Sequence, residues 1–141
     1  MQELCCGNHQ RHRSTHIPTR EIMSSESAVF PADLDAMLAA ADNHALLLEN
    51  DRVRVLDSWV KAGESTPVHT HEWPSVLYVI GFSDFVRRDA RGDVLFDSRE
   101  SDQKPAPGQA FWSAPLEPHF VTNVGDSDIR IISVEIKPQD E

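Results

Sequence analysis

Cysteine is nearly absent from this 141-residue sequence, since the only two, Cys5 and Cys6, are adjacent near its start. Neighbouring cysteines cannot cross-link distant parts of a fold, so the sequence offers no disulfide framework. Unpaired thiols are typical of a reducing compartment. Residues 1–28 also lack the apolar segment of a secretory signal, and we therefore predict a cytoplasmic location.

Long hydrophobic runs and an excess of basic residues are missing as well. No uninterrupted apolar stretch approaches the roughly 20 residues that a membrane-spanning helix needs, so we predict no membrane insertion. Thirteen Lys and Arg face 23 Asp and Glu, for a formal net charge of −10. Such a charge disfavours nonspecific binding to nucleic acid or to an anionic membrane. With 40% hydrophobic and 26% charged residues, the composition is that of an ordinary globular domain.

The first 28 residues contain little apolar surface compared with the rest of the chain. Their larger aliphatic side chains are only Leu4, Ile17, Ile22 and Met23. A segment of this kind cannot offset the conformational entropy that it would lose on ordering. We therefore predict a disordered N-terminal arm over residues 1–28.

Beyond residue 28, apolar residues first recur with the spacing of an α-helix. Leu34, Met37, Leu38 and Ala41 stand at positions i, i+3, i+4 and i+7, which places them on one helix face. The pattern predicts an N-terminal helix of about three turns within residues 29–44, packed on the outside of the domain. We identify no candidate catalytic group in this helix.

From residue 45 onward the hydrophobic period falls from nearly four to two, which is typical of β-strands. Turn residues such as Asn50-Asp51 and Gly125-Asp126 separate the runs. The runs expected to form strands are 46–49, 53–60, 75–80, 85–88, 94–97, 109–112, 119–124 and 129–136. So many short strands predict an all-β fold, a sandwich or barrel, for a domain over residues 45–141.

The segment around His69-Thr70-His71 carries the most informative pattern. His69 and His71 are two residues apart, so on a strand both side chains leave the same face. Two imidazoles that face inward can converge on one metal ion. The pair alone leaves a second interpretation open, in which both histidines face solvent on an edge strand.

The surroundings of this pair resemble the first motif of the cupin superfamily. That motif is a Gly, five residues, His-x-His, three or four residues, a Glu, six residues and a Gly. Gly63, His69 and His71 match its spacing, and Gly81 matches its closing Gly with one residue missing.

A later stretch resembles the second cupin motif, which is a Gly, about five residues, Pro-x-Gly, two residues, His, three residues and Asn. Gly108, Pro115, His119 and Asn123 match it, although no Gly follows Pro115. The resemblance covers about residues 45–137 and implies a double-stranded β-helix, or jelly-roll barrel.

The glutamate of the first motif is missing here, because its position falls at Ser75 or Val76. The resemblance therefore implies a metal site of three histidines, His69, His71 and His119. Such a site would leave open positions for water, oxygen or substrate.

Glu72 is the alternative fourth ligand. It follows His71 directly and would point outward from a regular strand, unless the stretch from Glu72 to Pro74 is irregular. We expect the site to hold one divalent transition-metal ion, with Fe²⁺ favoured and Zn²⁺, Ni²⁺ or Mn²⁺ as alternatives.

Three neutral imidazoles leave a divalent ion with its full charge, so the site should prefer an anionic ligand atom. Salt screens charges beyond about 8 Å, so the local ion outweighs the net charge of the chain. We therefore expect a small anionic metabolite as substrate. Arg54, if it faces inward, is the candidate partner of a substrate carboxylate, and Trp73 and Tyr78 are further candidate contacts.

Three-histidine sites of this kind are similar to those of thiol dioxygenases, although the Ser-x-His-x-Tyr arrangement expected there is absent. The chain is also similar to short bacterial cupins, some of which are associated with β-alanine degradation. The resemblance implies a mononuclear non-haem metalloenzyme of the oxygenase or dioxygenase type. The alternative is a non-catalytic module that binds a small ligand through its metal. We also expect a homodimer, as cupins commonly form.

Overall fold

The structure is a computed structural model that describes residues 29–140. The disordered arm predicted for residues 1–28 lies outside the described residues. In the described part of the chain, no helix is long and apolar enough to cross a membrane.

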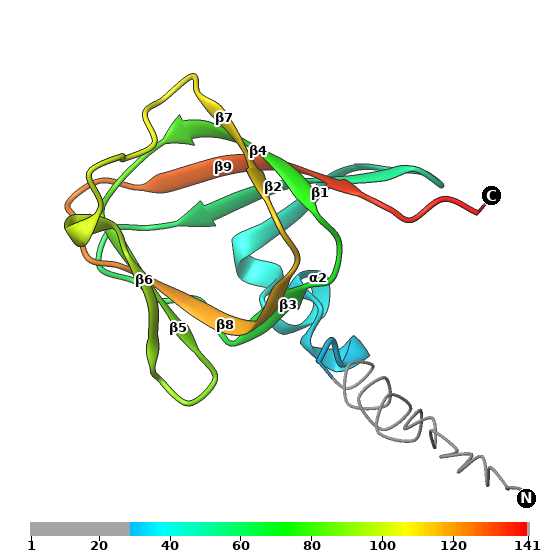
Figure 1. Cartoon of the computed structure of the whole chain (residues 1–141), viewed down its shortest axis with the longest axis horizontal. Helices are drawn as coiled ribbons and strands as arrows, with labels where there is room; N and C mark the ends of the chain where they lie inside the picture. The colour runs from blue at the N-terminus through cyan, green and yellow to red at the C-terminus, as the bar shows by residue number, and fades with distance from the viewer. Residues whose placement is uncertain (1–28, 141) are drawn as a thin grey trace, which may run out of the picture.

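Two antiparallel sheets face each other and enclose the interior (Figure 1). The larger sheet has five strands in the order β1 (His44–Glu49), β2 (Val53–Val60), β9 (Ile129–Ile136), β4 (Ser75–Gly81) and β7 (Ala110–Ser113). The smaller sheet has four strands in the order β3 (His69–His71), β8 (Leu116–Asn123), β5 (Phe85–Asp89) and β6 (Val94–Asp97). The predicted all-β barrel is confirmed.

The N-terminal segment is helical, but less regular than its apolar spacing predicts. It consists of the 3₁₀ turn η1 (Ala32–Leu34), the α-helical turn α2 (Ala36–Ala39) and the 3₁₀ turn η2 (Ala41–Asn43). The carboxylate of Asp35 accepts a hydrogen bond from the N–H of Met37 at 3.0 Å, so α2 begins only after Asp35. The short helix does pack on the outside of the barrel, where it contacts β1 and β3 (Figure 1). A further 3₁₀ turn, η3 (Ser98–Glu100), follows β6.

Among the described residues, more polar or charged side chains than hydrophobic ones are buried. Leu56 and Val79 are fully buried on the inward face of the larger sheet, and so is the carboxylate-bearing Glu135. His69 and His119 are each only 2% exposed on the smaller sheet. Because a buried polar or charged group is destabilising unless it is paired, this interior is built around specific polar contacts.

Candidate metal centre

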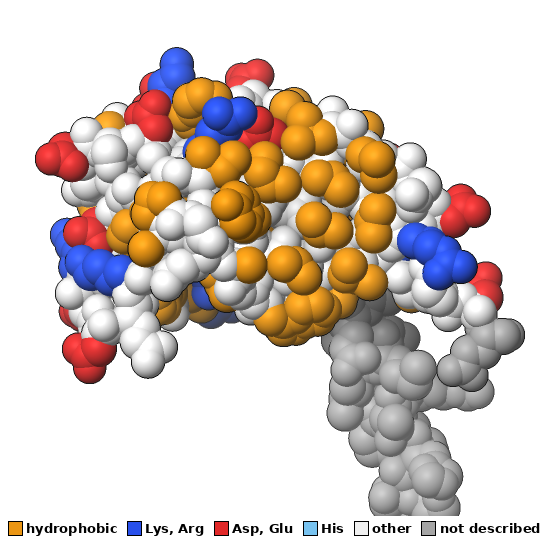
Figure 2. Space-filling model, turned by 90° about the horizontal axis from the view of Figure 1, so that it is seen from above, with side chains coloured by type: hydrophobic (Ala, Val, Ile, Leu, Met, Phe, Trp, Pro, Cys, Tyr) orange, Lys and Arg blue, Asp and Glu red, His pale blue; other side chains and the backbone are white. Residues whose placement is uncertain are grey.

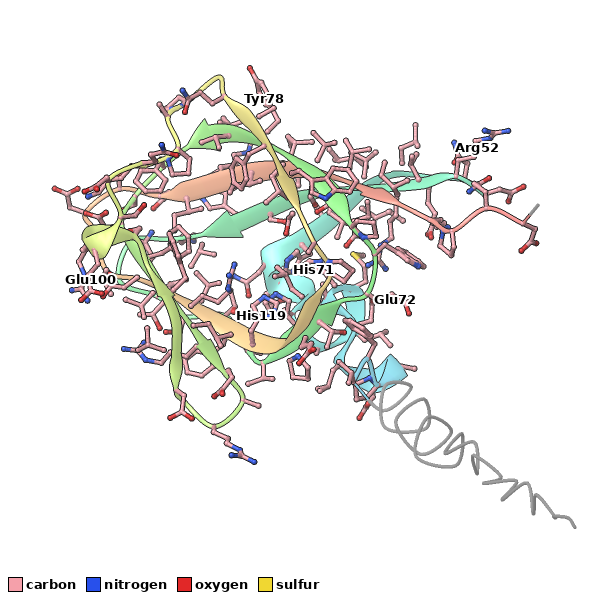
Figure 3. The ribbon with its side chains drawn as sticks, in the orientation of Figure 1. Arg52, His71, Glu72, Tyr78, Glu100 and His119 are labelled. Atoms are coloured by element: carbon pink, nitrogen blue, oxygen red, sulfur yellow. The ribbon has the colours of Figure 1, made fainter. Side chains whose placement is uncertain are left out.

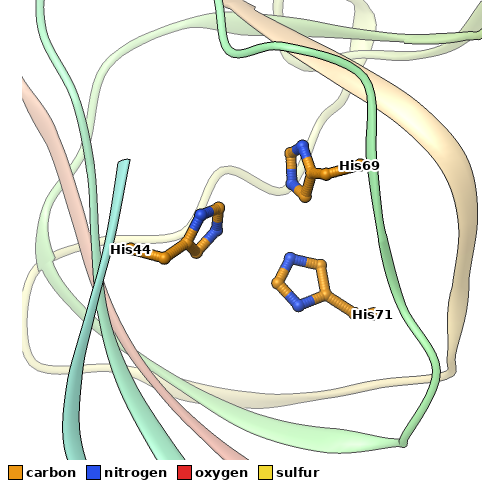
Figure 4. A group of neighbouring side chains, drawn as sticks. All are labelled: His44, His69 and His71. Atoms are coloured by element: carbon orange, nitrogen blue, oxygen red, sulfur yellow. The ribbon is translucent and has the colours of Figure 1, made fainter. Parts of the chain in front are cut away.

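Three histidines from two elements converge inside the barrel. His69 and His71 point inward from β3, and His44 points inward from the first position of β1 (Figure 4). One ring nitrogen from each of the three lies within 4.8 Å of the others. The ring of His44 is 4.9 Å from that of His69 and 5.2 Å from that of His71, centroid to centroid.

His119 completes a cluster of four imidazoles. It lies on β8 directly opposite His69 in the β3–β8 pairing, and the two ring centroids are 4.4 Å apart. The ring of His71 is 5.9 Å from that of His119, and both lie within the barrel (Figure 3). The structure therefore places the ring of His119 beside those of His69 and His71, but the three histidines whose ring nitrogens all lie within 4.8 Å of one another are His44, His69 and His71.

Hydrogen bonds fix the proton on one nitrogen of each ring. The Nδ1 atoms of His44, His69 and His119 lie 2.9, 2.8 and 2.7 Å from the carbonyl oxygens of Ala40, Pro67 and Glu117, in that order. A carbonyl oxygen only accepts, so each Nδ1 carries the hydrogen. In a neutral imidazole the lone pair is then on Nε2, which is the nitrogen that can bind a metal. The donor set thus fits a transition-metal ion.

Burial keeps these rings neutral. Together with the neighbouring His71, it lowers the pKa of His44 from 6.5 to about 4. Burial likewise lowers the pKa of His119 to about 4 and that of His69 to about 2. Because metal binding needs an unprotonated nitrogen, a site held neutral at pH 7 is ready to accept an ion.

A buried network of charges lies behind His71. The Nδ1–H of His71 donates to Oε2 of Glu135 at 2.9 Å, and Arg54 donates from Nε to the other oxygen of the same carboxylate. The two terminal nitrogens of Arg54 each donate to Asp35 at 3.0 Å. A carboxylate that accepts from the second nitrogen of a metal-binding histidine fixes its ring orientation and makes Nε2 a stronger donor.

The charges of this network stabilise one another. Burial alone would raise the pKa of Glu135, but the hydrogen bonds from His71 and Arg54 hold it below its usual value. Burial opposes the charge of Arg54, but Asp35 and Glu135 raise its pKa above the usual value. Both groups are therefore ionised at neutral pH, and the network carries one net negative charge beside the cluster.

No protein-family model matches the sequence, and no curated protein matches it. A cupin domain from Bordetella pertussis is similar in structure, with a TM-score of 0.55 and 20% identity over 67% of this chain and 92% of that one. This chain has the cupin fold. An RmlC-like cupin from Methanocaldococcus jannaschii aligns with a TM-score of 0.48 and 12% identity, over 66% of this chain and 77% of that one.

The cupin barrel contains an open cavity of about 170 Å³ next to the histidines. All four rings of the cluster line it. Apolar side chains make up much of the remaining wall, namely Val60, Leu77, Phe82, Phe85, Phe111, Leu116, Val121, Ile129 and Ile131. Among the described residues that line the cavity there is no Asp, Glu, Lys, Tyr or Cys. Among the described residues of the wall, Arg87 is the one side chain that is charged at neutral pH.

The other residues singled out from the sequence lie outside this cavity. The guanidinium of Arg54 is inward but already occupied by Asp35 and Glu135, and the ring of Trp73 covers it at 5.0 Å. Tyr78 is 47% exposed on the outside of the barrel, and Glu72 is an exposed residue after the end of β3 (Figure 3). None of these four side chains lines the cavity.

Sequence reasoning missed His44 because it assigned this residue to the end of the N-terminal helix. The strand instead begins at His44, two positions before the run of leucines that marked it in the sequence. One signal was present: His44 precedes Leu46 by two residues, so the two share a strand face. Leu46, Leu47 and Leu48 are consecutive, so their sequence shows no alternation that would distinguish the inner face from the outer one, and all three are exposed in the structure.

Proposed function

We propose that this protein binds one divalent transition-metal ion through Nε2 of His44, His69, His71 and His119. The observation that carries the proposal is the set of four inward imidazoles whose Nδ1 atoms are all hydrogen-bonded elsewhere. Imidazole donors suit iron, zinc and nickel, and we retain Fe²⁺ as the favoured ion, with Zn²⁺, Ni²⁺ or Mn²⁺ as alternatives.

We further propose that the protein is a mononuclear non-haem metalloenzyme of the oxygenase or dioxygenase type, which acts on a small anionic metabolite. A bound Fe²⁺ would supply Lewis acidity and reactivity towards oxygen. The chain supplies neutral ligands, a mostly apolar wall, and Glu135, which orients His71. A cytoplasmic location and an association with β-alanine degradation stay predictions.

A non-catalytic module that binds a small ligand through its metal is the second candidate. It is favoured by one observation, the lack of a carboxylate, amine, phenol or thiol among the described residues of the cavity wall. Without such a group, the wall offers no general acid or base apart from the histidines.

The two candidates are separated by one experiment on the full chain. The protein is loaded anaerobically with Fe²⁺, its metal content is measured, and oxygen uptake is followed with thiols and short carboxylic acids. Uptake that depends on one of these compounds supports the enzyme. Stoichiometric iron with no uptake for any compound supports the binding module. No stoichiometric metal in the wild-type protein contradicts both.

A homodimer that forms through the outer face of the larger sheet is also part of the proposal. Paired residues across all five strands form one uncharged apolar row, in the order Leu48, Val55, Val134, Val76 and Trp112. The next row contains Ala45, Asp57, Ile132, Tyr78 and Ala110. The outer face of an antiparallel sheet is normally polar, so an apolar one indicates a covering partner.

A second copy of this chain suits that face on electrostatic grounds. Two chains of net charge −10 repel each other, so they can associate only where acidic side chains are few or neutralised. On this face Asp57 is paired with Arg130 at 2.8 Å, and hydrophobic side chains cover much of the remainder (Figure 2).

A further inference from the structure

Arg87 is a charged residue in the cavity wall that takes no part in the proposed metal site. It lies on β5 opposite Val121 of β8 and lines the cavity with it. His119 is two residues from Val121 on β8, so Arg87 is displaced from His119 by about 7 Å along the strand direction and lies on the neighbouring strand. The guanidinium lies over the ring of Phe96, with Cζ 5.9 Å from the ring centroid.

No anion in the described part of the chain pairs with Arg87. The buried Arg54 and the more exposed Arg99 and Arg130 each form an ion pair with a carboxylate, whereas Arg87 forms none with a described residue. Its Nε is buried without a hydrogen-bond partner. Burial lowers the pKa of Arg87, and no neighbouring carboxylate offsets that effect. Arg87 is half-buried, and a guanidinium nitrogen that is buried without a partner is destabilising until an acceptor reaches it.

A second unpaired group lies across the same cavity. The hydroxyl of Ser133, on β9 of the opposite sheet, is buried without a hydrogen-bond partner and also lines the cavity. Of the three buried side-chain groups left unpaired among the described residues, two are therefore in this one wall. Unpaired polar groups that face one cavity from both sheets indicate a missing polar ligand.

We propose that Arg87 is the specificity-determining residue that binds the carboxylate of a small monocarboxylate ligand inside the cavity. This inference rests on the proposed function, because it places the rest of the ligand beside the metal that the histidines would hold. A guanidinium matches a carboxylate with two parallel hydrogen bonds. Ser133 offers one further donor from the opposite sheet.

The cavity also limits the body of this ligand. A volume of about 170 Å³ is close to that of protein cavities, on the order of 150 Å³, that hold one benzene molecule. Phenylalanine, leucine and isoleucine side chains form much of its wall. The part of the ligand that fills this space is therefore compact and apolar, about the size of benzoate or smaller.

The test measures ligand binding to the full chain loaded with Zn²⁺, by calorimetry and by ligand-observed NMR. The probes are propionate, 2-methylpropanoate and benzoate, each compared with its neutral amide, and inorganic phosphate. The variants are Arg87→Gln, Arg87→Lys and the matched control Arg88→Gln. Arg88 is the next residue on β5 and does not line the cavity.

We expect at least one carboxylate to bind the wild-type protein at least about tenfold more tightly than its amide. Arg87→Gln should weaken that carboxylate at least about tenfold and leave the amide unchanged, while Arg88→Gln changes neither. Arg87→Lys keeps the charge and should retain part of the preference for the carboxylate over the amide. This variant provides the test if Arg87→Gln fails to fold. Equal binding to wild-type and Arg87→Gln protein, binding of phosphate alone, or no binding of any carboxylate would overturn the inference.

Zinc content, measured on the same samples, separates this inference from the proposed function. Full zinc content with no carboxylate preference overturns the role of Arg87 and leaves the metal site standing. Loss of zinc from the wild-type protein overturns the metal site itself. Carboxylate binding that persists in metal-free protein and disappears in Arg87→Gln supports the role of Arg87 without the metal.

Discussion

His71 and Glu135 are 64 positions apart in the chain, and their side chains meet at 2.9 Å inside the barrel. The same carboxylate accepts from Arg54, and Arg54 in turn reaches Asp35 at the start of α2. A turn on the outside of the barrel is thereby connected to a proposed metal ligand inside it. The N-terminal segment, in which the sequence revealed no candidate chemistry, positions His71 through Asp35 and His44 through the carbonyl of Ala40.

Replacing Glu135 with Gln should weaken metal binding. The amide keeps an acceptor for His71 but removes the negative charge that strengthens Nε2 and balances Arg54. Changes to such a partner lower metal affinity by about 10- to 100-fold. Zn²⁺ titration against a competing chelator measures the change. The matched control is Glu117→Gln, an exposed side chain on β8, and equal affinities for wild type and Glu135→Gln would contradict the proposed role.

Replacing Asp35 with Ala should destabilise the fold by about 2 kcal/mol or more. The change removes the cap of α2 and half of the pairing of the buried Arg54. Urea unfolding followed by circular dichroism measures it. Asp33→Ala removes an exposed carboxylate two residues away and should change stability by less than about 0.5 kcal/mol. A loss of similar size in both variants would show that the cap and the ion pair contribute little.

Metal-free protein should lose stability as the pH falls from 6.5 towards 4. Burial holds the pKa values of His44 and His119 at about 4 in the folded state, below the 6.5 of an exposed histidine. Between these values the unfolded chain binds more protons, so the stability present above pH 6.5 is progressively lost. Each such histidine contributes about 1.4 kcal/mol per pH unit within this window.

Urea unfolding at a series of pH values, in the presence of a chelator, measures this slope. His44→Gln removes one of the buried titrating groups, so its slope should be smaller than that of the wild-type protein. A stability that does not change across the window, or an unchanged slope in His44→Gln, would show that these rings are not held neutral by burial.

A lysine on the outer face of the larger sheet should disrupt the proposed homodimer. Tyr78 lies in the second row of that face and is 47% exposed, so Tyr78→Lys places a charge in the interface without entering the cavity. Light scattering after size-exclusion chromatography should show a dimer for the wild type and a monomer for the variant. Leu95→Lys, at a 55% exposed position on β6 of the other sheet, is the control and should remain dimeric. A monomeric wild-type protein would rule out this interface.

The sequence predicted the strands well because their alternation depends only on local side chains. Seven of the expected strand ranges fall within one or two residues of observed strands at both ends, and β3 was anticipated from the His69-Thr70-His71 spacing. β8 alone begins three residues before its expected start at His119. The N-terminal helix is shorter than expected because the backbone of Asp35 is not helical. Its side chain instead caps α2 and pairs with Arg54.

The site was less predictable, because it depends on contacts between distant segments. The alternation of β9 places Glu135 on the same face as Ile129 and Ile131, but nothing local distinguishes that inner face from the outer one. Likewise, Arg54 and Arg87 are both inward arginines on strands. Only the positions of Asp35 and Glu135 determine that Arg54 is occupied and that Arg87 is not.

X-ray absorption of the protein loaded with one equivalent of Zn²⁺ or Fe²⁺ tests the metal proposal most directly. Our account predicts a first shell of nitrogen or oxygen at about 2.0–2.1 Å for Zn²⁺, with the scattering pattern of three or four imidazoles. His71→Ala should remove tight binding of the ion. A metal that binds without imidazole scattering, or stoichiometric tight binding that survives His71→Ala, would contradict the assignment of these histidines.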